Sequence, residues 1–115
     1  MKRLCLTAGE RLLIDRRRER MTQREAASAW DVGRRQYRTW ETDVVEDGDE
    51  VEGAPMVDLG TIRGHEKCYI FRLRADIEQR DLAARIGISR WWLCLMEHGE
   101  VPAETLVNWW DRKVA

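Results

Sequence analysis

The sequence repeats itself at an offset of 56 residues, and this repeat constrains the fold more than any other feature of the chain. The two copies align without a gap, and conservative pairs such as Val32 with Ile88 lie between the identical ones. Because the shared positions are in phase with the apolar positions expected to face a core, the repeat predicts two copies of one fold rather than a chance match. Nine pairs are identical: Glu10 with Glu66, Ile14 with Ile70, Arg16 with Arg72, Arg18 with Arg74, Gln23 with Gln79, Arg24 with Arg80, Ala27 with Ala83, Arg34 with Arg90 and Glu41 with Glu97.

The first copy has the pattern of three short helices. Thr7 with Glu10, and Thr22 with Glu25, each form the Thr-x-x-Glu capping box that marks a helix start. Trp30 is expected to close the second of these helices on its buried side. The expected core of this copy consists of Leu12, Leu13, Ile14, Met21, Ala26, Ala27, Val32, Tyr37 and Trp40.

An acidic stretch separates the two copies. Residues 42–53 are rich in Asp, Glu, Gly and Val, which predicts an exposed loop or a flexible linker. Pro55, followed by Met56, Leu59 and Ile62, predicts a short amphipathic helix that packs back onto the first copy. We therefore divide the chain into units 1–63 and 64–115, each so small that the units, or copies of the chain, need to share apolar surface.

The net charge of −1 hides an uneven distribution. Residues 1–41 hold 11 basic and 6 acidic residues, a balance of +5. Residues 42–62 hold 7 acidic residues and no basic one, a balance of −7, and residues 63–115 hold 9 basic and 8 acidic residues, a balance of +1. A basic first unit is thus masked in the total by the acidic middle of the chain.

Several classes of protein are disfavoured by the composition. No apolar run is long enough to span a membrane, and charge follows the first residues too soon for a signal peptide, so a cytoplasmic location is expected. Three cysteines, an odd number, indicate reduced thiols. His65 with Cys68, and Cys94 with His98, each supply only half of a zinc site, so no metal is expected. No catalytic constellation or cofactor motif is recognisable, and we expect no enzymatic activity.

Residues 22–43 have the outline of a helix-turn-helix motif. A short helix leads into a turn at Asp31-Val32-Gly33, and the next helix carries mostly Arg, Gln and Thr at its outer positions. In such a motif the second helix lies in the major groove of DNA.

The second copy carries a more specific resemblance. Residues 79–90, Gln-Arg-Asp-Leu-Ala-Ala-Arg-Ile-Gly-Ile-Ser-Arg, and residues 96–102, Met-Glu-His-Gly-Glu-Val-Pro, resemble the lambda-repressor-like (XRE, Cro/C1-type) transcription regulators. The match covers most of residues 64–110, and residues 7–43 look like a more diverged member. The resemblance implies an all-α fold of two tandem helix-turn-helix units joined by the acidic loop. Asp31 and Gly33 replace the glycine and serine of the family's turn, which implies a tighter or looser turn, and His98 stands at a position that tolerates left-handed backbone.

The resemblance also implies the residues that meet DNA. Gln23 and Gln79 would start the second helix of each unit near a phosphate. The groove-facing residues of the second unit would be Arg90, Trp91, Trp92, Cys94 and Leu95. Those of the first unit are donors for guanine, adenine and phosphate, and together with the first turn of the preceding helix they give the predicted DNA-binding set: Gln23, Arg24, Arg34, Arg35, Gln36, Arg38 and Thr39.

The second unit is expected to serve a different purpose. Its tryptophans offer large apolar area and few fixed donors, and soluble monomers seldom expose such a cluster. The face is expected to pack against another copy of the chain, another protein, or the tail that contains Leu106 and Val107; the alternative is that some tryptophans fill a small core. The predicted protein interface consists of Trp91, Trp92, Leu95, Trp109 and Trp110.

These patterns favour a transcription regulator that binds double-stranded DNA, of the compact kind common in phages and mobile elements. The first unit would read a half-site and the second would form a homodimer. A variant of this hypothesis uses both units of one chain on an asymmetric site. Alternatives are a protein-binding anti-activator, adaptor or antitoxin-like partner, and a recombination accessory factor that uses the same groove contacts.

Overall fold

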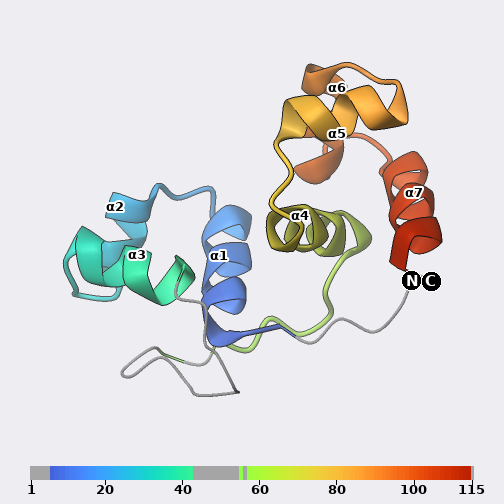
Figure 1. Ribbon diagram of the computed structural model, residues 1–115. Coiled ribbons are helices and arrows are strands. Elements are labelled where there is room, and N and C mark those ends of the chain that lie inside the picture. The colour runs from blue at the N-terminus through green and yellow to red at the C-terminus, as the bar shows by residue number, and fades with distance from the viewer. Residues whose placement is uncertain (1–5, 43–54, 56, 115) are drawn as a thin grey trace. The chain divides into compact units, whose positions relative to one another are not determined.

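The computed structural model describes residues 6–42, 55 and 57–114, and within these ranges the chain forms seven α-helices and no β-strand (Figure 1). This confirms the predicted all-α class. The chain divides into two compact units between Gly60 and Thr61, three residues before the expected boundary. No helix in the described ranges combines the length and apolar character needed to cross a membrane. The N-terminal unit contains α1 (Ala8–Arg18), α2 (Gln23–Ala29) and α3 (Arg34–Thr42); the C-terminal unit contains α4 (Gly64–Arg74), α5 (Gln79–Ile86), α6 (Arg90–Glu97) and α7 (Glu104–Val114).

The 56-residue offset of the sequence is also the offset of the helices. α1 and α4, α2 and α5, and α3 and α6 start at positions that differ by 56. The backbone between the first two helices of each unit repeats as well, because Arg20 and Asp76 both adopt left-handed conformations with φ of 55°. Helix α7 has no counterpart among the described residues of the N-terminal unit. The repeat therefore extends from residue identity to helix boundaries and turns.

The N-terminal unit has the core that its sequence predicts, with one exception. Both capping boxes form, with Thr7 and Thr22 accepting from the amides of Glu10 and Glu25. Trp30, expected to be buried, is 39% exposed because it follows the last residue of α2, where the chain already leaves the core. The buried residues are Leu12, Leu13, Ile14, Ala26, Ala27, Tyr37 and Trp40, with Met21 and Val32 partly buried against them.

The segment that follows α3 departs from the prediction. The expected acidic loop falls almost wholly in residues 43–54, outside the described ranges, as does Met56. The prediction of a helix after Pro55 is wrong, because residues 57–63 contain no helix. Gly60 has a φ of 65°, and its amide donates to Asp58 Oδ1 at 3.0 Å, a local turn that competes with a helix. The segment still packs on the N-terminal unit, since Leu59 is buried and its carbonyl accepts from Arg18 Nη1 at 2.7 Å.

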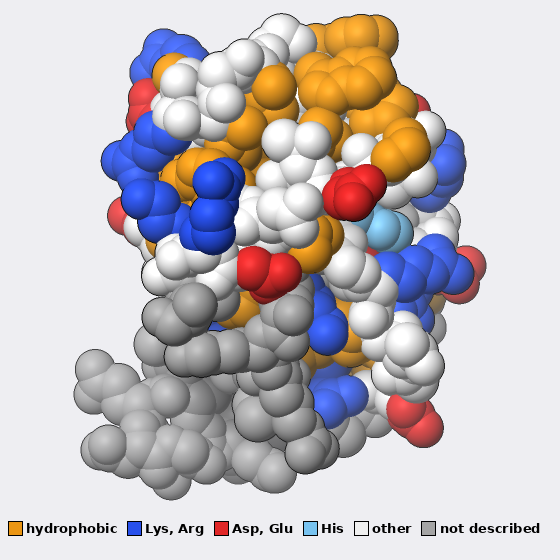
Figure 2. Space-filling model, turned by 90° about the vertical axis from the view of Figure 1, so that its right-hand side faces the viewer, with side chains coloured by type: hydrophobic (Ala, Val, Ile, Leu, Met, Phe, Trp, Pro, Cys, Tyr) orange, Lys and Arg blue, Asp and Glu red, His pale blue; other side chains and the backbone are white. Residues whose placement is uncertain are grey.

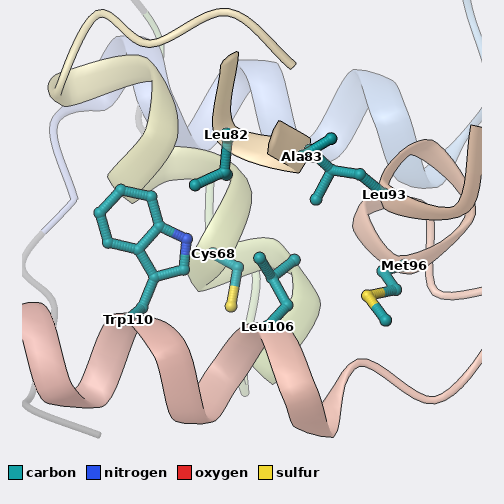
Figure 3. Packing of buried hydrophobic residues seen from close by; sticks show 7 residues of the cluster. All are labelled: Cys68, Leu82, Ala83, Leu93, Met96, Leu106 and Trp110. Atoms are coloured by element: carbon teal, nitrogen blue, oxygen red, sulfur yellow. The ribbon is translucent and has the colours of Figure 1, made fainter. Parts of the chain in front are cut away.

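The core of the C-terminal unit is closed by α7. The close view of this core shows Leu106 and Trp110 reaching from α7 toward side chains of the other three helices (Figure 3). Trp110 also stacks on Phe71 of α4, with ring centroids 5.7 Å apart. Helix α7 supplies both residues and so completes the core of the C-terminal unit. The outer face of α6 is not covered by α7. The cluster comprises Cys68, Leu82, Ala83, Leu93, Met96, Leu106 and Trp110.

Candidate nucleic-acid interface

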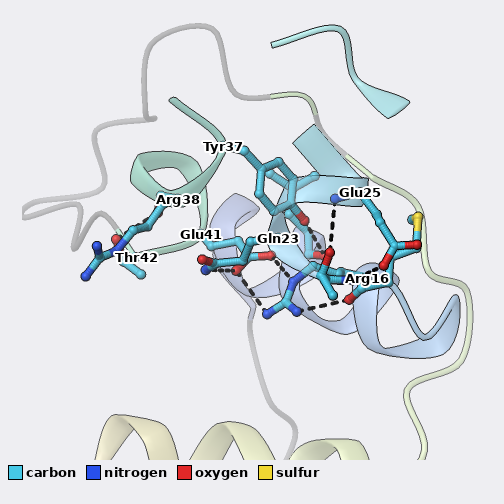
Figure 4. A network of polar contacts seen from close by, with 10 residues as sticks. Arg16, Gln23, Glu25, Tyr37, Arg38, Glu41 and Thr42 are labelled. Carbon is cyan, nitrogen blue, oxygen red and sulfur yellow. Dashed lines mark hydrogen bonds and ion pairs between the residues drawn. The ribbon is translucent and has the colours of Figure 1, made fainter. Parts of the chain in front are cut away.

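A buried carboxylate fixes the third helix of the N-terminal unit. Glu41, near the end of α3, has a side chain that is 2% exposed and accepts from Arg16 Nε of α1 at 2.7 Å (Figure 4). Gln23 Nε2, at the start of α2, donates to the other carboxylate oxygen at 3.1 Å. A charge removed from water needs such partners to be tolerated. The three side chains thus tie α3 to both preceding helices and set the direction in which its outer face points.

The C-terminal unit contains the same network. Arg72 Nε donates to Glu97 Oε2 at 2.7 Å, and Gln79 Nε2 donates to Glu97 Oε1 at 2.9 Å. The arginine of each network also donates to a backbone carbonyl: Arg16 to that of Met21, and Arg72 to that of Ile77. All three partners are among the identical pairs of the repeat, but their mutual contact was not predicted from the sequence. Polar residues that are identical at inward-facing positions were the signal that could have revealed it.

This network changes the expectation for Gln23. The side chain is half-buried, and one of its amide N–H groups is used inside the unit. A side-chain amide held in this way is less free to rotate and donate to a phosphate than an exposed amide is. We therefore regard Gln23 first as a residue that positions α3.

The outer face of α3 carries the predicted polar residues, and every one of them is exposed. Tyr37 and Trp40 lie on the opposite, buried side of the helix, as the helical period requires. Thr39 Oγ1 donates to the carbonyl of Arg35 at 3.0 Å. Within the described residues, no acidic side chain forms an ion pair with the arginines of this face. The face comprises Arg34, Arg35, Gln36, Arg38 and Thr39, and Arg24 of α2 is exposed as well.

The turn before this helix has the same form in both units despite different residues. Asp31 takes the left-handed conformation that Gly87 takes in the C-terminal unit, with φ of 57° and 88°. The amide of Val32 donates to the carbonyl of Ala27 at 3.0 Å, and the equivalent bond of Ile88 has the same length. The tighter or looser turn expected from the replacements is therefore not seen relative to the C-terminal unit.

His98 does not have the left-handed backbone that was expected. Its φ is −90°, and the next residue, Gly99, takes the positive φ of 75°. A Cβ at Gly99 would lie 2.7 Å from the His65 ring, so the glycine is needed for space as well as for conformation. His98 Nδ1 lies 2.7 Å from the carbonyl oxygen of Cys94. Among the described residues, no three His, Cys, Asp or Glu side chains gather as a metal site would require.

The outer face of α6 is aromatic. Trp91 is 69% exposed and Trp92 is 38% exposed, with ring centroids 6.3 Å apart, while Leu95 is half-buried. Figure 2 shows hydrophobic side chains gathered at the top of the view, the height at which Figure 1 shows α6. Within the described part of the C-terminal unit, α7 does not cover this face, so Trp91 and Trp92 do not fill the core of that unit.

The tryptophans of α7 differ from those of α6. Trp110 is 5% exposed and belongs to the core, so its assignment to a protein interface is wrong. The packing of α7 on α4 is the cause, because it turns this side chain toward Phe71. Trp109 is half-buried and meets the Trp110 ring edge-on at 4.9 Å. The exposed aromatic surface thus consists chiefly of Trp91 and Trp92.

Comparisons with protein-family models, with curated proteins and with solved structures give no match. Two features of this chain bear on its function: the exposed cationic face of α3, and the aromatic residues that occupy the equivalent face of α6.

Proposed function

We propose that the protein is a sequence-specific DNA-binding transcription regulator made of two tandem lambda-repressor-like helix-turn-helix units. The observation that carries this proposal is the outer face of α3, where three arginines, a glutamine and a threonine are exposed on one helix. A helix face that only contacts solvent needs neither a set of hydrogen-bond donors nor a fixed orientation. Reading DNA needs both, because sequence is recognised by donors and acceptors held against base edges.

In this proposal the side chains of α3 divide into two groups. Arg35 and Gln36 contact base edges in the major groove, where a guanidinium suits guanine and an amide suits adenine. Arg24, Arg34 and Arg38 contact phosphates and set the register, and Thr39 lies at the edge of the contact. The Arg16–Glu41 pair contributes indirectly, because it orients α3 before DNA arrives. Preorganised donors lose less conformational entropy on binding than mobile ones.

The C-terminal unit is proposed to form the homodimer. Trp91, Trp92 and Leu95 would make its centre, with Trp109 at the margin. Exposed indole rings are favoured at interfaces because they bury a large area and keep one polar group. A dimer would hold two α3 helices about 34 Å apart, one turn of the double helix, on a palindromic site.

The proposal is tested by selecting duplexes from a random library with the wild-type protein and titrating the selected site. Arg35→Ala and Gln36→Ala are expected to lose the preference for that site over scrambled DNA, with about a tenfold to hundredfold loss of affinity for the site. Arg85→Ala removes an equal charge from an exposed position of α5 and serves as the control. Wild-type affinity should fall steeply as salt rises. A folded Arg35→Ala variant with unchanged site preference would refute the reading role.

A protein-binding adaptor is the second candidate, and the exposure of Trp91 and Trp92 favours it. Such a protein would form a stable complex with an unlike chain and would show no salt-sensitive binding to DNA. The same titration separates the two candidates.

A further inference from the structure

A thiol and an imidazole lie side by side at the end of α6. Cys94 Sγ is 3.6 Å from Nδ1 of His98, the residue that follows the last turn of the helix. Cys94 is half-buried and His98 is exposed, so solvent reaches the pair. Thiolate and imidazole are ligands that zinc prefers, and side chains four positions apart on one helix face can share a zinc ion.

The hydrogen bond of His98 fixes which of its ring nitrogens is free. Nδ1 lies 2.7 Å from the carbonyl oxygen of Cys94, and Nδ1 carries the proton because a carbonyl oxygen can only accept. Nε2 of the neutral ring therefore keeps its lone pair, and among the described residues it meets no hydrogen-bond donor. Histidines that bind metals usually have this arrangement, in which one nitrogen donates to a carbonyl and the other holds the ion.

The N-terminal unit shows that the fold does not need this pair. Its equivalent positions hold Arg38 and Thr42. Thr42 Oγ1 donates to the carbonyl of Arg38 at 2.8 Å, so a hydroxyl makes the same bond to the backbone that His98 makes. The bond to the backbone thus accounts for a side-chain donor at this position. It accounts neither for a second ring nitrogen nor for the thiol four residues earlier.

One chain supplies only half of a zinc site. Within the described part of the chain, no third His, Cys, Asp or Glu joins the pair. Cys94 and His98 follow the same face of α6 as Trp91 and Leu95, because positions 91, 94, 95 and 98 are three or four residues apart. Trp91 and Leu95 belong to the surface proposed for the homodimer. A two-fold dimer brings the same patch of both copies together, so groups near the axis meet their own equivalents.

We propose, on the basis of the homodimer in the proposed function, that two copies of the chain bind one zinc ion between them. Cys94 Sγ and His98 Nε2 of each copy are the ligands. Two thiolates and two imidazoles complete the tetrahedral set of a structural zinc site. Each thiol releases its proton to solvent when it binds, so the affinity for zinc rises with pH. Because the site exists only in the dimer, zinc stabilises the dimer relative to two separate chains.

The site is tested on the full chain with cobalt(II), which occupies tetrahedral zinc sites and absorbs visible light when thiolates bind it. After metal is removed with a chelator, the titration is expected to saturate at one ion for two chains, and zinc should displace the cobalt. Cys94→Ser and His98→Gln should each weaken cobalt binding about a hundredfold or more, since losing a ligand costs at least as much as losing an outer-shell partner. Cys68→Ala removes the buried thiol of α4 and is the matched control, with unchanged cobalt binding. Saturation at one ion per chain, or a lack of thiolate absorption, overturns the shared site.

A variant of the apolar contacts tests whether the site needs two copies. Trp91→Ser/Leu95→Ser keeps both ligands but removes dimer contacts, so it is expected to bind cobalt about tenfold or more weakly than the wild type. An unchanged cobalt affinity in this variant shows that one chain suffices and overturns the proposal.

Light scattering with zinc and with chelator distinguishes failure of the metal site from failure of the dimer. Zinc is expected to lower the dissociation constant of the dimer about tenfold or more. A protein that is a dimer in chelator and takes up no cobalt overturns the zinc site and leaves the dimer standing. A protein that stays monomeric in zinc overturns both. The preference for the selected DNA site, measured beside Arg35→Ala, tests the reading role independently of either result.

Discussion

At the scale of the single residue, Cys68 shows how burial controls an ionisation. The thiol is fully buried between α4 and the rest of the C-terminal core, and burial raises its pKa from 9.0 to about 12, with Glu97 and Asp111 adding to the effect. The folded state therefore favours the protonated thiol. Its contribution to stability is complete below pH 9 and is lost as the pH rises from 9 toward 12, because only the unfolded chain loses the proton there.

Cys68→Ala is expected to weaken this pH dependence. The wild-type free energy of unfolding should fall above pH 9 with a contribution from Cys68 of up to about 1.4 kcal/mol per pH unit, and the variant should lack that contribution. Denaturant titrations on both sides of pH 9 measure the difference. Cys94→Ala, which removes a half-buried thiol from α6, is the matched control. Parallel pH profiles for wild type and Cys68→Ala would contradict the assignment.

At the scale of the element, the residues that precede α3 and α6 differ in whether they cap the helix. Ser89 Oγ accepts from the amide of Trp92 at 3.1 Å and so caps α6. Gly33, the equivalent residue, gives α3 no such cap, and a Cβ built on it would meet nothing within 4 Å. Helix starts are stabilised by a serine in this position.

Gly33→Ser is therefore expected to stabilise the N-terminal unit by about 0.5–1 kcal/mol, through the new cap and a less flexible unfolded chain. The reciprocal change Ser89→Ala should destabilise the C-terminal unit by about 1 kcal/mol. Chemical denaturation of both variants beside the wild type measures the effects. A destabilised Gly33→Ser protein would show that the serine does not adopt the capping rotamer.

The helices could be predicted from sequence because their signals are local. Capping boxes at Thr7 and Thr22 mark two starts, and the period of Tyr37 and Trp40 fixes the buried side of α3. Residues 57–63 were mispredicted because Asp58 and Gly60 form a turn that their apolar neighbours conceal. Exposure of the α3 arginines followed from the same period, whereas their role in DNA binding remains a prediction.

At the scale of the whole molecule, the remaining errors concern contacts between distant residues. Trp109 and Trp110 are adjacent, so no pattern within α7 decides which one is buried; the Phe71 ring of α4 decides it. The Arg16–Glu41 pair joins residues 25 positions apart, and the charge of both side chains argues against burial when composition alone is considered. The repeat contained the second answer in part, since Arg16 and Glu41 are identical to Arg72 and Glu97.

The dimer is the prediction that belongs to the whole chain. Trp91→Ser/Leu95→Ser is expected to convert a wild-type dimer into a monomer with nearly the same free energy of unfolding, because Trp91 is 69% exposed within its own unit. Trp30→Ser alters a tryptophan of the N-terminal unit that is as exposed as Trp92, so it controls for the loss of surface aromatics and should remain a dimer. Size-exclusion chromatography with light scattering gives the mass of each protein.

The proposed dimer would also determine how tightly two half-sites are held. With one α3 helix bound, such a dimer would keep the second near its half-site at a high effective concentration, so its affinity would exceed that of one unit without any new contact. The monomeric variant should bind a two-half-site duplex no more tightly than a duplex with one half-site, while its sequence preference stays that of the wild type. A wild-type monomer would contradict the dimer and assign the exposed tryptophans to an unlike partner. A variant that remains dimeric would show that the dimer forms through another surface.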